Sequence, residues 1–223
     1  MMTGTLVNTA AIIAGGLIGT IGKKALNDST AHTILQGIGL VVFLIGTQMA
    51  LEARDVLIVL IAIVLGGLIG ELGRIHHHLE VMGERLEKRF SGQPIAAGFV
   101  TATILFCIGS MSILGPIQSG VEGVHTILFL KSVIDFVVSL VLASTMGIGV
   151  ALSAVSVLIF QGTFTLLAGL LDPFITPEML RDINATGGLL IVAIAINMFV
   201  PGRIRTANFL PAVLLVIVYH LIR

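Results

Sequence analysis

Long apolar runs with short polar breaks fill almost the whole chain, and each run is about long enough to cross a bilayer. An α-helix rises about 1.5 Å per residue, so about 20 apolar residues span a hydrocarbon core of about 30 Å. We predict an all-α polytopic membrane protein with about eight transmembrane helices, over residues 4–21, 34–51, 56–73, 94–113, 124–145, 147–171, 186–200 and 208–222. Only the uncharged residues 144–149 separate the fifth and sixth runs, so seven spans are the alternative.

Few residues are left over for a soluble domain. Hydrophobic residues make up 56% of the chain and charged residues 11%, against roughly 25% charged residues in an ordinary soluble domain. The formal net charge is zero, so nothing in the composition indicates a nucleic-acid partner. The single cysteine, Cys107, excludes a disulfide within the chain, and neither a metal nor another cofactor is predicted. The first apolar run follows no basic segment, so we expect it to stay as a helix rather than be cleaved.

Basic residues between the spans predict the orientation, because they are enriched on the cytoplasmic side. With the N-terminus outside, the inner side receives Lys23, Lys24, Arg74, Arg85, Lys88, Arg89, Arg203 and Arg205, and the outer side receives Arg54, Arg181 and Arg223. We therefore predict an external N-terminus.

Residues 74–93 form the one sizeable hydrophilic segment, and apolar residues recur in it every three to four positions. These are Leu79, Met82, Leu86 and Phe90. The pattern predicts an amphipathic connecting helix on the cytoplasmic membrane surface. Three consecutive histidines, residues 76–78, stand near its start; they cannot all face one metal ion from a helix, so we interpret them as a polar loop.

Two repeats occur within the chain. The short one, Gly-Gly-Leu-Ile-Gly, stands at residues 15–19 and 66–70. Its small-xxx-small spacing predicts close helix packing. In the longer repeat, Asn8–Gly16 resembles Gln161–Gly169, and Gly39–Met49 resembles Gly188–Met198.

The longer repeat relates spans one to three to spans six to eight. An odd offset of five spans makes the two copies cross the membrane in opposite senses, as in the inverted repeats of many secondary transporters. The predicted domains are 1–73 (first repeat), 74–93 (connecting helix), 94–146 (central hairpin) and 147–223 (second repeat). Asn8 and Gln161, and likewise Gln48 and Asn197, would be symmetry-related amides.

The connection within the central hairpin, residues 109–123, is rich in Gly, Ser and Pro, and we expect it not to be helical. Either it is an ordinary outer loop, or it dips into the membrane and presents polar groups to a permeating species. Its candidate site residues are Ser110, Ser112, Gln118 and Glu122.

Lys131 and Asp135 stand one helical turn apart near the middle of an apolar span. A charge at this depth costs at least roughly 2.5–3.5 kcal/mol on insertion scales. Ser132 and Ser139 fall on the same helix face. Either the pair only neutralises itself and pins helices together, or Asp135 binds an ion or a proton with Lys131 as its countercharge.

The chain also closely resembles the DUF554 family of bacterial inner-membrane proteins. The matching residues are Gly4-Thr5 with Val7-Asn8-Thr9, Gly66 to Glu71, Gly109-Ser110-Met111, Lys131-Ser132 with Asp135, Gly147 to Val150 with Ser153, Gln161-Gly162, Asn184 to Gly188, and Ala207-Asn208 with Leu210-Pro211. Where the family's Asp is typically followed by Gly, this chain has Phe136. The resemblance implies an integral inner-membrane protein and no particular activity.

Two functional hypotheses remain. In the first, the protein is a transporter or channel for a small ion or polar metabolite, bound by Asp135, Lys131, Ser132, Asn8 and Gln161, with Asn197 and the hairpin residues as further contacts. In the second, it is a structural or accessory membrane protein whose polar groups satisfy each other. Glycine-rich faces are compatible with a homodimer. The chain contains no HExxH, GxSxG or P-loop motif, so we expect no enzyme activity.

Overall fold

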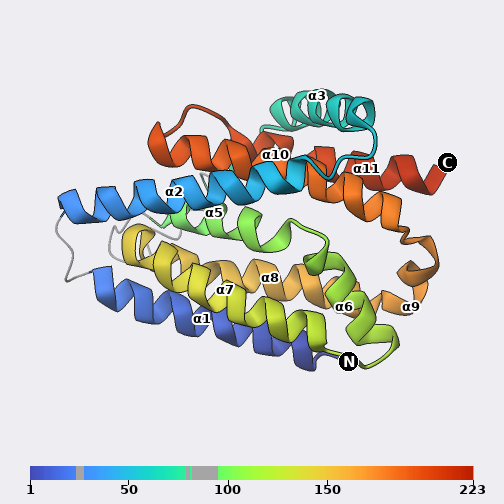
Figure 1. The fold of residues 1–223 in the computed structure, drawn as a ribbon, viewed down its shortest axis with the longest axis horizontal. Coiled ribbons are helices and arrows are strands. Elements are labelled where there is room, and N and C mark those ends of the chain that lie inside the picture. Colours follow the sequence, from blue (N-terminus) through green and yellow to red (C-terminus); the bar gives the residue numbers. More distant parts are fainter. Residues whose placement is uncertain (24–27, 79–80, 82–94, 223) are drawn as a thin grey trace. The chain divides into compact units, whose positions relative to one another are not determined.

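The computed structural model describes residues 1–23, 28–78, 81 and 95–222, and these form helices and connections without a strand. They divide into two compact units (Figure 1). Unit 1 comprises Met1–Leu35 with Met82–Pro173, and unit 2 comprises Gln36–Val81 with Phe174–Arg223. The predicted all-helical class is confirmed. The predicted amphipathic helix over 74–93 lies largely outside the described residues.

Unit 1 is a bundle in which α1 packs lengthwise against α7 and also contacts α8 (Figure 1). A Cβ added at Gly15 would lie 2.2 Å from Ser139 Oγ, and one at Gly16 would lie 2.7 Å from the Cα of Ala151. The glycines therefore permit a close approach of these helices, as predicted. The helices of unit 1 are α1 (Thr3–Lys23), α5 (Ala96–Cys107), α6 (Met111–Val121), α7 (Thr126–Met146), α8 (Gly149–Leu166) and the short α9 (Ala168–Leu171).

The α5–α6 pair is bent by 59° at a short break. Gly109 in the break has φ +128°, a conformation that favours glycine. The expectation that residues 109–123 are not helical is wrong for most of the segment, because 111–121 form α6. Six of its residues, including Pro116, are buried, and α6 packs against α7 and α8. Tertiary packing thus outweighs the low helix propensity of Gly, Ser and Pro.

Unit 2 contains two close helix contacts. In the first, α3 packs on η2 and α11, and a Cβ at Gly66 would lie 2.4 Å from Ala212 N. In the second, a Cβ at Gly46 of α2 would lie 2.8 Å from the carbonyl oxygen of Gly188 of α10. The helices are α2 (Asp28–Ala50, in unit 2 from Gln36), α3 (Val56–Leu72), α10 (Pro177–Phe199), η2 (Thr206–Phe209) and α11 (Leu210–Ile222); the 3-10 turn η1 (Asp172–Phe174) lies where the units divide.

Helix α10 begins nine residues before the predicted span 186–200. Thr176 caps it by accepting a hydrogen bond from Met179 N, and Pro177 occupies the first turn. Polar residues such as Arg181 and Asp182 therefore belong to the helix rather than to a loop.

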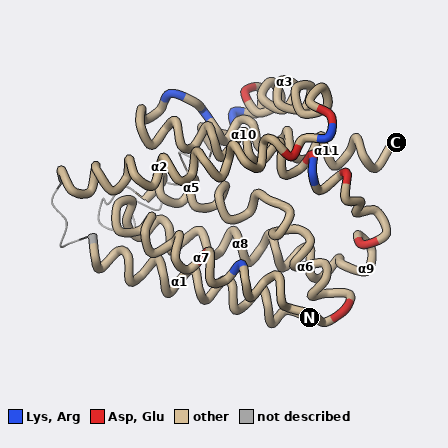
Figure 2. Tube along the Cα trace, viewed as in Figure 1, with Lys and Arg blue, Asp and Glu red and all other residues tan. Residues whose placement is uncertain are grey.

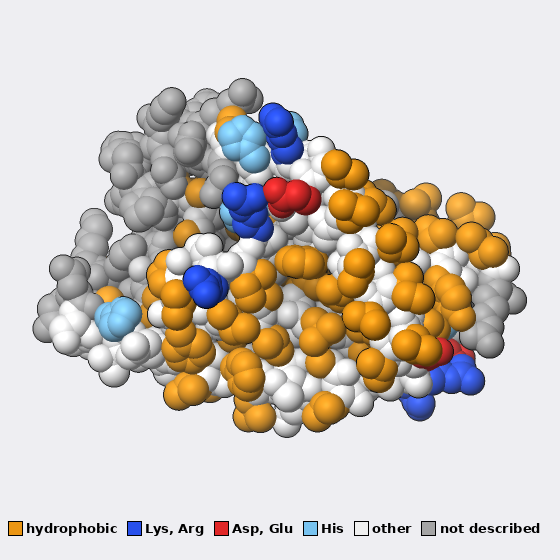
Figure 3. All heavy atoms as spheres, turned by 90° about the horizontal axis from the view of Figure 1, so that it is seen from above, with side chains coloured by type: hydrophobic (Ala, Val, Ile, Leu, Met, Phe, Trp, Pro, Cys, Tyr) orange, Lys and Arg blue, Asp and Glu red, His pale blue; other side chains and the backbone are white. Residues whose placement is uncertain are grey.

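Within the described part of the chain, five helices are long and apolar enough to cross a membrane, and the bent α5–α6 pair would make a sixth span. The apolar helices 56–72 and 206–222 are shorter, so the count of eight spans stays a prediction. Charged residues lie mostly at helix ends (Figure 2), and hydrophobic side chains cover much of the face in Figure 3. On α3, Leu57, Ile61 and Leu68 are each more than half exposed, as expected of a surface that faces lipid.

Candidate functional site

The polar stripe predicted on α7 is buried in unit 1. Lys131 is 7% exposed and Asp135 3% exposed, and the Ser132 and Ser139 side chains are buried with them. The rest of α7 is largely apolar. The charges therefore sit within the bundle and not on its surface.

Lys131 and Asp135 form an ion pair within α7. The Lys131 Nζ lies 3.0 Å from Asp135 Oδ1 and 2.9 Å from Oδ2. The ammonium thus contacts both carboxylate oxygens at the distance of a charge-assisted hydrogen bond. The two charges therefore pair with each other, and the formal charge of the pair is zero.

Two amides from other helices extend the pair. Asn8 of α1 donates from Nδ2 to Asp135 Oδ2 at 3.0 Å and to Gln161 Oε1 of α8 at 3.3 Å. Both amides are fully buried. Lys131, Asp135, Asn8 and Gln161 therefore form one continuous polar chain across three helices, and we call these four residues the α7 cluster.

The α7 cluster does not satisfy all of its own polar atoms. Asn8 Oδ1 and Gln161 Nε2 are buried and have no hydrogen-bond partner. A buried polar group without a partner costs about 1–3 kcal/mol, and such groups in a native protein call for an explanation, for example a bound water or ion.

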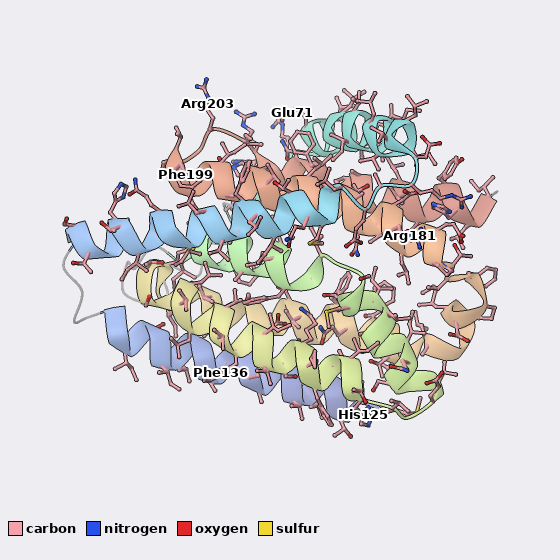
Figure 4. All side chains as sticks on the ribbon, in the orientation of Figure 1. Glu71, His125, Phe136, Arg181, Phe199 and Arg203 are labelled. Atoms are coloured by element: carbon pink, nitrogen blue, oxygen red, sulfur yellow. The ribbon has the colours of Figure 1, made fainter. Side chains whose placement is uncertain are left out.

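The hydroxyl groups of Thr165, Ser132 and Ser139 donate to backbone carbonyls of their own helices and not to the side chains of the α7 cluster. Thr165 Oγ1 donates to the Gln161 carbonyl at 2.9 Å and lies 3.1 Å from Thr5 Oγ1. Ser132 donates to the Leu128 carbonyl at 2.7 Å, and Ser139 to that of Phe136 at 2.9 Å. Figure 4 shows Phe136 on α7. Ser132 lies on the predicted face, but its proton stays within its own helix.

The hairpin residues predicted to contact a solute form local hydrogen bonds. Ser112 donates to the carbonyl of Phe106 at 2.8 Å across the α5–α6 break. Gln118 donates to Glu122 at 3.1 Å, and this contact is exposed. Ser110 directly precedes α6. Ser119, which the sequence did not single out, donates to the Met1 carbonyl at 2.7 Å and lies 2.7 Å from Nδ1 of His125. His125 directly precedes α7 (Figure 4).

Asn197 belongs to unit 2, where its side chain forms hydrogen bonds with the backbone of Ile204 in the loop after α10. Its Nδ2 donates to the Ile204 carbonyl at 2.7 Å and its Oδ1 accepts from Ile204 N at 2.9 Å. Gln48, its predicted counterpart, is exposed. This pair of amides therefore does not form a contact like that of Asn8 and Gln161.

Sequence reasoning missed a buried carboxylate in unit 2. Asp182 is 1% exposed; its Oδ1 accepts from Arg54 N at 3.1 Å, and its Oδ2 lies 3.0 Å from His220 Nε2. The residue falls outside the predicted span 186–200, and no candidate site predicted from the sequence includes it. A helix start at Thr176-Pro177 was the signal that could have placed it on a helix.

A second polar group in unit 2 lines an open pocket of about 650 Å³. Glu71 accepts from Arg205 at 2.8 Å and from Asn208 Nδ2 at 2.5 Å. Glu71 and Arg203, both lining the pocket, lie near one end of α3 (Figure 4). Among the described residues, no group of three His, Cys, Asp or Glu side chains could hold a metal ion.

Comparison with known proteins identifies the family of the chain. The model of a family described as "Protein of unknown function (DUF554)" matches residues 3–221. The "Uncharacterized membrane protein YdfK" of Bacillus subtilis (strain 168) is 34% identical over 218 residues, which cover 96% of this chain and 93% of the relative. The "Uncharacterized protein YqgA" of Escherichia coli (strain K12) is 28% identical over 222 residues, covering 96% and 94%. No solved structure matches. The chain is therefore a membrane protein that belongs to the DUF554 family.

Proposed function

We propose that this protein transports a small ion or polar solute across the bacterial inner membrane, and that the α7 cluster binds it. The observation that carries the proposal is the combination of a buried ion pair on α7 with two amides that leave Asn8 Oδ1 and Gln161 Nε2 unpaired. A purely structural network would be expected to use these atoms, because each unpaired one costs about 1–3 kcal/mol. A polar ligand or a chain of water at the cluster would satisfy both.

The break between α5 and α6 supports the same proposal. Transporters commonly place binding sites beside discontinuous helices, whose freed backbone groups are available near the membrane midplane. Here the break lies between Cys107 and Met111, and α5 and α6 both pack against α7 and α8. The broken element thus lies in the same unit as the cluster.

We also infer the inverted repeat, and reciprocal contacts support it. A two-fold axis that exchanges Gly39 with Gly188 would also exchange Met198 with Met49. In unit 2, a Cβ at Gly39 would lie 3.3 Å from Met198 Cβ, and one at Gly188 would lie 2.8 Å from Met49 Cβ. In unit 1, the equivalent amides of Asn8 and Gln161 contact each other directly, as expected for residues next to such an axis.

The test is water accessibility beside Asp135. In a Cys107→Ser background, single Ser132→Cys and Ser153→Cys variants are treated in membranes with a membrane-impermeant thiol reagent, with Glu122→Cys as the exposed control. Ser132 and Ser153 form a matched pair of test and control positions, because both side chains are buried and both donate a hydrogen bond to a carbonyl of their own helix. Transport predicts labelling at Ser132→Cys and none at Ser153→Cys.

The second readout is flux in liposomes. Asp135→Asn should abolish solute flux while the protein still inserts and purifies. If Ser132→Cys stays as unreactive as Ser153→Cys while Glu122→Cys reacts, the cluster is dry and the transport proposal is wrong. The polar groups would then serve helix packing, as in an accessory membrane protein.

A further inference from the structure

The α7 cluster keeps hydrogen-bond donors that its own acceptors do not use. Both N–H groups of Asn8 are used, by Asp135 and Gln161. An ammonium has three N–H groups and the Asp135 oxygens take at most two, so Lys131 keeps at least one; Gln161 Nε2 keeps both of its own. On the acceptor side, Asn8 Oδ1 is unused, and Asp135 Oδ1 and Gln161 Oε1 each accept a single hydrogen bond.

One of these unused donors belongs to the Lys131 ammonium, and a positively charged donor favours a ligand that accepts hydrogen bonds. An anion could accept from Lys131 and Gln161 without removing any existing acceptor. A cation would find Asn8 Oδ1 unused, but both oxygens of Asp135 already face the Lys131 ammonium, which would repel it. The chemistry of the site is therefore that of an anion site with a carboxylate beside it.

Charge balance then requires a second ion. The buried pair is formally neutral, and an anion entering alone would leave one uncompensated negative charge inside the bundle, which is unfavourable at membrane depth. A proton on Asp135 restores neutrality: the anion becomes the partner of Lys131, and the proton from solution forms an O–H bond on the carboxylate. No other bond forms or breaks except hydrogen bonds.

We infer that the solute is a small monovalent anion carried together with one proton, the anion held by Lys131 and Gln161 and the proton by Asp135. This rests on the proposed transport function and names its substrate class. The expected transport is electroneutral, because the cluster holds the same net charge when empty and when loaded.

The two amides give the exchange a mechanism. While Asp135 is ionised it accepts from Asn8 Nδ2, as observed. Once protonated it becomes a donor, and a half-turn of the Asn8 amide would bring Oδ1 to accept from it. A matching turn of Gln161 would let one N–H of Nε2 donate to the same oxygen, and its second N–H would stay available to the anion. Asn8 Oδ1 and Gln161 Nε2, which now lack partners, would then be used, in exchange for the bonds that Asn8 Nδ2 and Gln161 Oε1 now make.

Few other titratable groups face Asp135. Among the described residues of the helices packed around it, Cys107 of α5 lies within electrostatic range of both Asp135 and Lys131. Helices α6 and α8 carry no charged residue, and the charged residue of α1 is Lys23 at its end. Proton uptake on anion binding should therefore be dominated by Asp135.

The test measures proton uptake by the purified wild-type protein. Sodium and potassium salts of chloride, nitrate and acetate are added to weakly buffered protein with a pH indicator, and binding is followed by calorimetry. We expect one proton taken up per bound anion, regardless of the cation. By linkage, the dissociation constant should rise tenfold per pH unit over the range in which free Asp135 is ionised.

Two variants assign the effect. The double variant Lys131→Met/Asp135→Leu should show neither binding nor proton uptake. Asp135→Asn should bind the anion with an affinity that does not depend on pH. If Asp135→Asn does not fold, infrared spectroscopy of the wild type replaces it: adding the anion at fixed pH should produce a carboxylic-acid band that is absent from the double variant.

The inference is wrong if none of the three anions causes proton uptake, if uptake follows the cation, or if affinity is independent of pH. Failure of transport itself would look different. An unreactive Ser132→Cys refutes transport, whereas a reactive Ser132→Cys with solute flux but no proton uptake refutes only the anion–proton coupling.

Discussion

Replacing both members of the buried ion pair separates a structural role from a functional one. Removing one partner leaves an uncompensated buried charge, so Lys131→Met or Asp135→Leu alone should cost about 3–5 kcal/mol of unfolding free energy. Both side chains are less than one tenth exposed, so solvent screening does not reduce this cost much. The double variant carries no charge. In the double variant one N–H of Asn8 loses its partner, which lowers the unfolding free energy by about 1–3 kcal/mol. Replacing the two buried ions with apolar groups raises the unfolding free energy by about 1–4 kcal/mol.

The unfolding free energy of the double variant should therefore differ from that of the wild type by at most about 3 kcal/mol, in either direction. The double variant should also be more stable than either single variant. The assay is thermal or denaturant unfolding of detergent-purified protein, followed by size-exclusion chromatography, with flux measured on the same preparations. We expect the double variant to be folded and inactive. The reasoning is refuted if the double variant is as unstable as the single variants, because the ion pair itself would then be needed for helix packing. It is also refuted if the double variant still transports the solute.

Two further predictions concern helix contacts. His220→Phe leaves Asp182 Oδ2 buried without its side-chain partner and should lower the unfolding free energy by about 1–3 kcal/mol. His77 is exposed, so the control His77→Phe should have no effect. Equal melting temperatures of the two variants would contradict this prediction. Gly15→Ala would place a Cβ 2.4 Å from the Phe136 carbonyl oxygen and should cost about 1–3 kcal/mol or more. Gly22→Ala meets nothing within 4 Å and should be neutral or gain up to about 1 kcal/mol; similar losses in both would refute the close-contact argument.

The helices were largely predictable because apolar runs in a membrane protein leave the backbone few alternatives. Every predicted span contains a helix, and α1, α3 and α7 agree with the predicted ranges to within about two residues at each end. The misassigned segment was α6, where Gly, Ser and Pro indicated a loop. Burial against neighbouring helices decided its conformation, and a pattern of local propensities does not contain that information.

The cluster was predictable for a different reason. The proposed internal repeat pairs Asn8 with Gln161, which lie 153 positions apart, and the two amides contact each other. Their contact with Asp135 could be expected only from the cost of isolated polar groups in lipid. Asp182 could not be found in this way, because its partners, Arg54 N and His220, come from segments with no recognisable relation to it.

Close helix packing and the chemistry of the cluster depend on each other. Asn8 has a short side chain, so it can reach Asp135 Oδ2 at 3.0 Å only if the backbones of α1 and α7 are nearly in contact. Gly15 and Gly19 provide that approach, since a Cβ at Gly19 would lie 2.2 Å from the Leu140 carbonyl oxygen. The glycine repeat, which as a sequence feature indicates only packing, thus also sets the distance at which an amide can respond to the charge on Asp135.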